Sequence, residues 1–389
     1  MSDFESKRRA IFERVACQIL KKINSTTGLM PGPKTKGHST GAHSRASGSD
    51  MRGTAYAATA LAMTGSFEVA WKAVAAVLDH QDRDPCSFTY GNFFWYADWK
   101  FALDPNAASF IVPHLCYVLR HCEQRMPAEL VKRLKESLPL CVSGLNAHRA
   151  TWGYTNIALL NMASKLMIGD VLGDPRARKL AYWDWEEWRN HTVRLGTITE
   201  YNSLCYTTVQ INAFAMMLTC NADPQFLHEV RGALRHLIAA SVMDYHPGVG
   251  RITGPQSRAY PNDRRLRGAS GMDTVLHFVL NTPEPADGCM LWLGVPLGPE
   301  DVPECARNLP LPRVTRTVAH GCSRFNYLGQ DFALGSVSGR GHWIGNEAPF
   351  FLAYRSRARR CGVPIMPYPQ NAEGHFAAQR EGRLLAATL

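Results

Sequence analysis

Apolar positions recur along most of the chain with the period of a helix. A stripe made by Phe4, Ile11, Val15 and Leu20 predicts an amphipathic helix over residues 4–23. The stretch that follows is rich in Gly, Ser, Thr and Pro, which predicts a long loop up to about residue 50. Beyond it the helical rhythm resumes in segments separated by turn residues, so the first part of the chain is expected to be mainly α.

Joints between polar and apolar segments recur about 50 residues apart, near Thr54, Asn106, Asn156 and Asn202. This period, with two helical segments per unit, is typical of stacked helical hairpins. If the hairpins curl into a ring, the inner helices begin at one rim and their asparagines converge on a central cavity. The pattern therefore favours an incomplete (α/α) toroid. An open solenoid, or asparagines that recur only as helix N-caps, would give the same spacing.

From about residue 310 the pattern changes to alternation with β-branched and aromatic residues between glycine-containing turns. This indicates a smaller C-terminal antiparallel β-sheet or β-sandwich. The predicted fold is mainly α, with an α/α toroid catalytic domain at 1–305 and an antiparallel β domain at 306–389.

Composition adds limits on partners and location. The 43 Lys and Arg against 33 Asp and Glu give a net charge of +10, which favours an anionic partner. No nucleic-acid-binding motif is present, and no segment reaches the roughly 18 apolar residues of a membrane span. The 11 cysteines are scattered without a CxxC pair, and the charged N-terminus lacks the apolar core of a signal peptide. A cytoplasmic protein without nucleic-acid or membrane partners is expected.

The stretch TITEYNSLCYTTVQINAFAMML combines a polar joint with an apolar helix. Within it Asn202, Tyr206 and Gln210 recur at i, i+4 and i+8, which places an amide, a phenol and a second amide on one stripe. Because the rest of the helix is apolar, this stripe is predicted to face a wet cavity. The alternative is that Tyr206 and Gln210 are buried polar groups satisfied by neighbouring backbone.

A second stretch, GNFFWYADWKF, is dense in aromatic residues whose rings suit the apolar faces of sugars. Buried structural aromatics are the competing interpretation. The predicted substrate-binding residues are Asn92, Trp95, Asn106, Trp152, Glu200, Asn202, Gln210 and Tyr260.

Three segments, TWGYTNIALLNMASKLMIGDVLGD, TEYNSLCY and RFNYLGQDFALGSVSG, resemble the heparinase II/III-like and alginate-lyase-like polysaccharide lyases. The resemblance implies an incomplete α/α toroid joined to a β-sandwich, and β-elimination at an acidic sugar. It also implies a catalytic Asn, close to a His, several tens of residues before a Tyr; Asn156 precedes Tyr201 and Tyr206 by 45 and 50 positions. The sequence departs from the family where Ile157 follows Asn156, because the family often has His there; the nearest upstream histidine is His148.

Elimination from a uronate requires a partner for the C5 carboxylate, a base for the C5 proton and an acid for the leaving oxygen. Asn156 and Arg258 are the candidate carboxylate partners. Tyr201 or Tyr206 is a candidate base or acid if nearby positive charge lowers its pKa, and His148 is the alternative base. The expected substrate is an acidic saccharide.

Three other functions fit the same residues. A glycoside hydrolase would use paired carboxylates, with Glu200, Asp98, Asp104, Asp244 and Asp273 eligible. A dehydratase or isomerase acting on a small alcohol would use Cys205 beside Tyr206, and a non-catalytic protein would bind acidic saccharides without turnover. Neither a metal nor an obligatory cofactor is expected, because His320, His342 and His375 show no characteristic ligand spacing.

Overall fold

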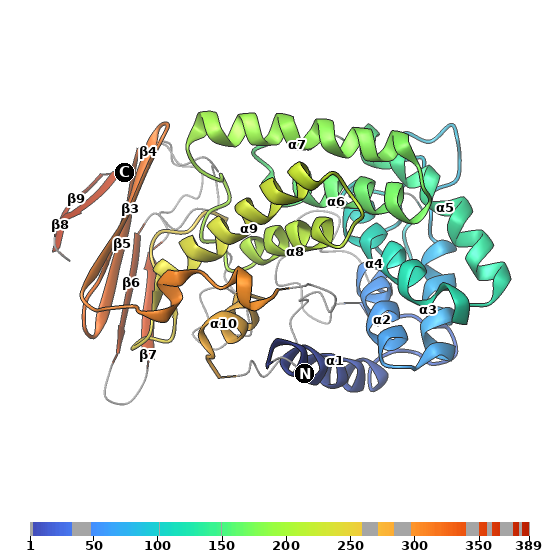
Figure 1. Ribbon diagram of the computed structural model, residues 1–389, viewed down its shortest axis with the longest axis horizontal. Helices are drawn as coiled ribbons and strands as arrows, with labels where there is room; N and C mark the ends of the chain where they lie inside the picture. The colour runs from blue at the N-terminus through green and yellow to red at the C-terminus, as the bar shows by residue number, and fades with distance from the viewer. Residues whose placement is uncertain are drawn as a thin grey trace.

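The computed structural model has a helical part followed by a β part, which confirms the predicted mainly α class with a C-terminal sheet (Figure 1). It describes residues 3–32, 48–100, 102–148, 150–258, 271–283, 297–339, 350–355, 360–365, 376–380 and 383–388.

Helical hairpins stack side by side, so that α2, α4, α6 and α8 form an inner row and α3, α5, α7 and α9 pack outside it. The four inner helices begin within a few residues of the predicted joints near Thr54, Asn106, Asn156 and Asn202. The helices are α1 (Asp3–Leu20), α2 (Met51–Met63), α3 (Phe67–Leu78), α4 (Ala107–Cys122), α5 (Ala128–Ala147), α6 (Thr155–Val171), α7 (Pro175–Leu195), α8 (Tyr206–Leu218), α9 (Pro224–Met243) and α10 (Gly271–Leu280), with short 3-10 turns η2 (Glu123–Arg125), η3 (Pro299–Asp301) and η4 (Glu304–Arg307).

The two ends of this row are bridged by α1, which packs on α2 at one end. At the other end the rings of Phe4 and Phe278 lie 5.7 Å apart between centroids, and Lys7 donates a hydrogen bond to Asn281 just after α10. Figure 1 shows α1 between α10 and α2. The helices therefore surround a common centre, as the toroid prediction requires.

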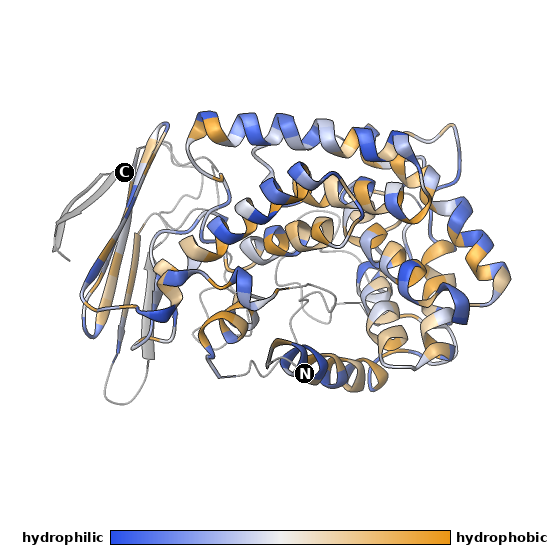
Figure 2. Cartoon of the chain, in the orientation of Figure 1, coloured by the Kyte–Doolittle hydropathy of each residue, from blue (hydrophilic) through white to orange (hydrophobic). Residues whose placement is uncertain are grey.

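Inner and outer helices differ in which faces are buried. In α6 nearly every side chain is buried, whereas α7 buries only a few positions and carries charged residues on its other faces. Figure 2 shows α7 as more hydrophilic than α8. A helix that is apolar on all sides must lie inside the protein, and an amphipathic one at its surface. The hydrophobic pattern thus separates the two layers.

Within the described residues, seven strands form one antiparallel sheet in the order β3-β4-β5-β6-β7, with β8 pairing with β5 and β9. A two-stranded ribbon, β1 with β2, precedes it. The strands are β1 (Tyr245–His246), β2 (Arg251–Ile252), β3 (Arg313–Ala319), β4 (Cys322–Leu328), β5 (Phe332–Gly339), β6 (Phe350–Arg355), β7 (Arg360–Ile365), β8 (Phe376–Arg380) and β9 (Arg383–Thr388).

The sheet contacts the helical part through a close backbone approach. A Cβ on Gly335 of β5 would lie 2.4 Å from Gly254 Cα, and Gly254 has a φ of +96°. Both positions therefore require glycine, one for space and one for its left-handed conformation. This contact fixes the segment that leads to Arg258.

Two sequence predictions for the first helix need correction. The helix ends at Leu20, not at residue 23, and Leu20 is 47% exposed. Ile11 and Val15 are buried as predicted, but Ile19 takes the inward position that had been assigned to Leu20. The 3.6-residue period places position 19 on the same face as Val15, and the spacing from Val15 to Leu20 drifts away from it.

Stability should fall with acid because of His114, a buried residue of α4. Burial lowers its pKa from 6.5 to about 3, and Arg52 adds to the effect; Thr59 Oγ1 lies 3.0 Å from His114 Nδ1. The folded state holds the neutral ring, so this stability is complete above pH 6.5 and is lost as the pH falls towards about 3. We expect the protonation of His114 to lower the free energy of unfolding by roughly 1.4 kcal/mol per pH unit between pH 6.5 and about 3. Denaturant unfolding at pH 7, 6 and 5 measures it, with His114→Gln as the control that lacks this slope.

Candidate functional site

The joint between α7 and α8 buries a carboxylate at its centre. The outer helix α7 ends at Leu195 and is capped by Gly196, which has a left-handed φ of 73°. The chain then crosses to α8, and in this crossing Glu200 is completely buried. A buried charge requires partners, so its surroundings define the site.

Glu200 is held by two residues from distant parts of the chain. The Asn156 backbone N donates to Glu200 Oε2 at 2.6 Å, and Asn156 Nδ2 donates to Oε1 and Oε2 at 2.7 and 2.8 Å. Arg258 Nη1 donates to Oε1 at 2.6 Å. Gln210 Nε2 donates to the Glu200 backbone oxygen at 3.2 Å. Both carboxylate oxygens thus accept donors, and Glu200 with Arg258 forms a buried ion pair whose side chains are 0% and 8% exposed.

Arg258 lies against two phenol rings. Its guanidinium carbon is 3.8 Å from the ring centroid of Tyr206, at the start of α8, and 4.9 Å from that of Tyr154, just before α6. Arg258 itself adopts a left-handed φ of 50°. Its backbone oxygen accepts a hydrogen bond from Ser203 Oγ at 3.4 Å. Backbone strain in a non-glycine residue persists where the surroundings hold it, which is common at functional sites.

Tyr154 is protonated at neutral pH. Burial raises its pKa above the usual value, and the nearby Arg258 charge opposes this without reversing it. The Asp104 and Glu200 carboxylates raise it further. Tyr154 is therefore suited to donate a proton rather than to accept one.

A second polar group lies on the same rim, where α5 ends and α4 begins. His148 Nε2 is 3.0 Å from Asn106 Oδ1, and because an amide oxygen only accepts, this nitrogen carries the proton and the lone pair is on Nδ1. Burial lowers the pKa of His148, with Asp104 opposing it, so the ring is neutral and basic at pH 7. The Asp104 carboxylate acts to raise the pKa of both His148 and Tyr154.

The structure separates the two tyrosines that the sequence treated as equivalent. Tyr206 lies under Arg258, whereas Tyr201 lies under Arg324 of β4, with the guanidinium carbon 4.0 Å from its ring centroid. Tyr201 is 4% exposed. Tyr201 therefore belongs to the contact between the sheet and the helices.

The stripe predicted from Asn202, Tyr206 and Gln210 is wrong as a continuous helical face. The helix α8 begins only at Tyr206, and Asn202 precedes it with a left-handed φ of 48°. Asn202 Nδ2 donates to Asp244 Oδ2 at 2.7 Å. Ser203 Oγ instead accepts from the Tyr206 backbone N at 3.1 Å, which satisfies one free donor of the helix start.

Asp244 joins this segment to the sheet. Besides Asn202, its carboxylate accepts hydrogen bonds from Thr315 of β3 and from Asn326 of β4, the latter at 3.0 Å. Thr315 and Asn326 are paired across the two strands. These hydrogen bonds to the sheet therefore hold the chain in place just before Tyr206, the candidate catalytic residue at the start of α8.

Asn92 and Trp95, which the sequence assigned to a substrate surface, are buried instead. Asn92 Oδ1 accepts from the backbone N of Phe93 and Ala108, and its Nδ2 donates to the Pro105 oxygen. Trp95 is 7% exposed and packs on Phe110 and under Arg52. Phe93, Trp95 and Tyr96 of this aromatic stretch are thus part of the core, where tertiary packing covers them. Tyr260 lies outside the described residues.

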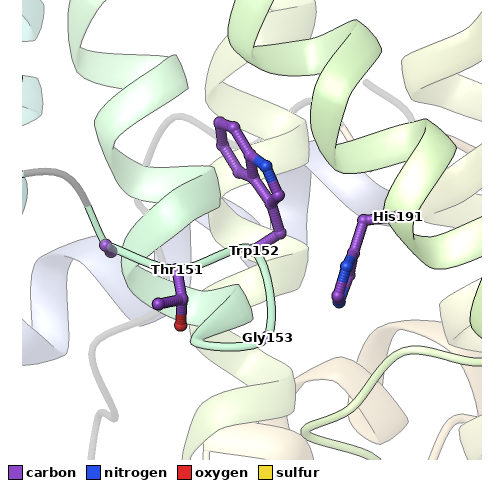
Figure 3. Close-up of a pocket in the computed structure, with 5 residues that line it drawn as sticks. Thr151, Trp152, Gly153 and His191 are labelled. Carbon is purple, nitrogen blue, oxygen red and sulfur yellow. The ribbon is translucent and has the colours of Figure 1, made fainter.

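A pocket of about 490 Å³ lies next to Tyr154, between the loop before α6 and the last turns of α7 (Figure 3). Thr199 Oγ1 donates to the Gly153 oxygen at 2.5 Å, so the pocket wall is tied to the residue that precedes Glu200. The lining residues are Ala150, Thr151, Trp152, Gly153 and His191.

Sequence reasoning missed Tyr154 and His191. Tyr154 stands two positions before Asn156 in the segment TWGYTNIALL, directly before the start of α6. This position at a predicted joint is the pattern that could have identified it. His191 lies on an amphipathic outer helix, and nothing in its spacing distinguishes it from a surface residue.

The described residues include no cluster of three or more histidine, cysteine or acidic side chains arranged to hold a metal ion. In the same residues no helix has the length and apolar character needed to cross a membrane.

Comparison with known proteins gives a family without an assigned activity. No curated protein matches the sequence. A family model described as "Domain of unknown function (DUF8769)" matches residues 38–273, which include Asn156, Glu200, Tyr206 and Arg258 but not the C-terminal sheet. Since this match covers more than half of the chain, the protein belongs to that family of unknown function.

Proposed function

We propose that the protein is a lyase that cleaves a uronic-acid-containing saccharide by β-elimination, on the scaffold of the heparinase II/III-like and alginate-lyase-like enzymes. One observation carries this proposal: the guanidinium of Arg258, anchored on buried Glu200, lies against the phenol rings of Tyr206 and Tyr154. A fixed cation beside a phenol favours the phenolate, and it also attracts the carboxylate of a uronate.

The proposed reaction breaks the C5–H and C4–O bonds of the sugar and forms a C4=C5 double bond. Tyr206 is the group proposed to remove the C5 proton, with neutral His148 as the alternative base. Tyr154 donates a proton to the departing glycosidic oxygen, since burial keeps its pKa high. Arg258 stabilises the negative charge that develops on the sugar carboxylate.

Asn156 is assigned a different role from the one expected from the sequence. Its Nδ2 already donates to both oxygens of Glu200. It is therefore a positioning residue that orients Glu200, which in turn holds Arg258, rather than a direct partner of the substrate carboxylate.

Hydrolysis by paired carboxylates receives less support. Both oxygens of Glu200 accept hydrogen bonds from Asn156 and Arg258, and those of Asp244 accept from Asn202, Thr315 and Asn326. A carboxylate saturated with donors is a poor base and a poor nucleophile.

We also propose an intracellular site of action, because the described cysteines are free thiols.

A panel of uronate polymers tests the proposal. The protein is incubated with polygalacturonate, alginate and a glucuronate-containing polymer, and the ultraviolet absorbance of the unsaturated uronate is followed together with new reducing ends. Both signals are expected to rise in parallel on one polymer. New reducing ends without the absorbance would indicate hydrolysis, and binding without either signal would indicate a non-catalytic protein; each result contradicts the proposal.

A further inference from the structure

The pocket between the loop before α6 and the end of α7 is adjacent to the candidate site but separate from it. Gly153 in its wall is followed directly by Tyr154, which contacts Arg258. On the opposite wall, His191 projects from α7 (Figure 3). The pocket is therefore one residue away from the proposed acid.

The lining has the chemistry of a site for a hydroxylated ring. The Trp152 indole is half-buried and presents an amphipathic aromatic surface, while Ala150 and Gly153 leave room beside it. The described lining residues include no Asp, Glu, Lys or Arg side chain.

His191 supplies a polar atom to which no described residue forms a hydrogen bond. Its Nε2 is shielded from solvent and has no hydrogen-bond partner among the described residues. A shielded polar atom without a partner costs free energy, and a ligand that supplies the missing hydrogen bond would recover it. Burial, aided by Arg194, lowers the pKa of His191, so the ring is neutral at pH 7 and offers one donor and one acceptor.

We infer that this pocket is a subsite for a further sugar ring of the saccharide, beyond the two rings joined by the bond that breaks, with Trp152 against its apolar face and His191 hydrogen-bonded to a hydroxyl. The volume of about 490 Å³ lies within the range of small-molecule sites. This inference rests on the proposed function for the identity of the ligand as a saccharide.

The test compares saccharides of different length. Disaccharides and tetrasaccharides from the cleaved polymer serve as substrates for wild type, His191→Leu, and His228→Leu, an exposed histidine of α9 that serves as the matched control. His191→Leu should raise KM for the tetrasaccharide about tenfold, the effect of one lost hydrogen bond, and leave kcat and the disaccharide reaction unchanged. His191→Gln, which retains a donor and an acceptor, should restore most of the tetrasaccharide affinity.

Calorimetric binding of tetrasaccharides from all three polymers separates the subsite from the lyase proposal. If wild type cleaves a polymer but His191→Leu affects short and long substrates equally, the subsite is wrong and the lyase proposal stands. If wild type cleaves nothing yet binds a tetrasaccharide about tenfold more tightly than His191→Leu does, the subsite stands and the lyase proposal is wrong. Tetrasaccharide binding that does not depend on His191 overturns the inference.

Discussion

Replacing Arg258 with methionine should lower kcat/KM for the proposed elimination by about 10²–10³-fold, because it removes the charge that we propose stabilises the transition state. The same change should destabilise the protein by about 3–5 kcal/mol, since Glu200 would keep a buried charge without its ion-pair partner. Initial rates of unsaturated-product formation and denaturant unfolding measure the two effects.

A double variant distinguishes catalysis from folding. Glu200→Gln combined with Arg258→Met removes both charges, so most of the lost stability should return while activity should not. Arg258→Lys should retain more stability than Arg258→Met but lose the flat contact with the phenol rings. If Arg258→Met keeps more than about a tenth of the wild-type kcat/KM, the guanidinium does not act in the reaction.

Tyr206→Phe should reduce kcat by about 10²–10⁴-fold, the usual contribution of a positioned proton-transfer group. The phenyl ring can still lie under Arg258, so the free energy of unfolding should change by no more than about 1 kcal/mol. The measurement is kcat on the polymer that wild type cleaves, together with a thermal or denaturant unfolding curve.

Tyr201→Phe is the matched control, because it removes the same hydroxyl from a tyrosine under a different arginine. Tyr201 lies beneath Arg324 at the contact with the sheet, so its loss should change kcat by less than about threefold. An equal loss of kcat in Tyr201→Phe and Tyr206→Phe would show that contact with Arg258 does not determine which tyrosine acts in the reaction.

The polar groups of the rim also connect the two parts of the chain. Asn202 directly follows Glu200 and Tyr201 in the joint, and its side chain donates a hydrogen bond to Asp244. Asp244 in turn accepts hydrogen bonds from two strands of the sheet. The sheet lies outside the residues that the family model matches, yet it contacts the segment that carries Tyr201. The sheet thus supports the site from outside the matched region.

The sequence by itself determined the helices, the change to strands and the repeated joints, because these depend on the local period of apolar residues and on turn residues. α4, α6 and α8 begin within a few residues of the predicted joints at Asn106, Asn156 and Asn202 for this reason. The polar-to-apolar joints also marked Asn156, Glu200 and Tyr206, and the chemistry that β-elimination requires marked Arg258. The hydrogen bonds from Asn156 to Glu200 were not predicted.

Only the tertiary structure decided which polar groups meet. Glu200 and Arg258 are 58 positions apart and Glu200 and Asn156 are 44 apart, and no local pattern encodes pairing over such distances. Packing also buried Trp95, which composition alone had placed on a sugar-binding surface, and it gave Tyr201 and Tyr206 different arginines. Burial and charge pairing depend on the whole chain, so the roles of these residues emerge only when the hairpins and the sheet come together.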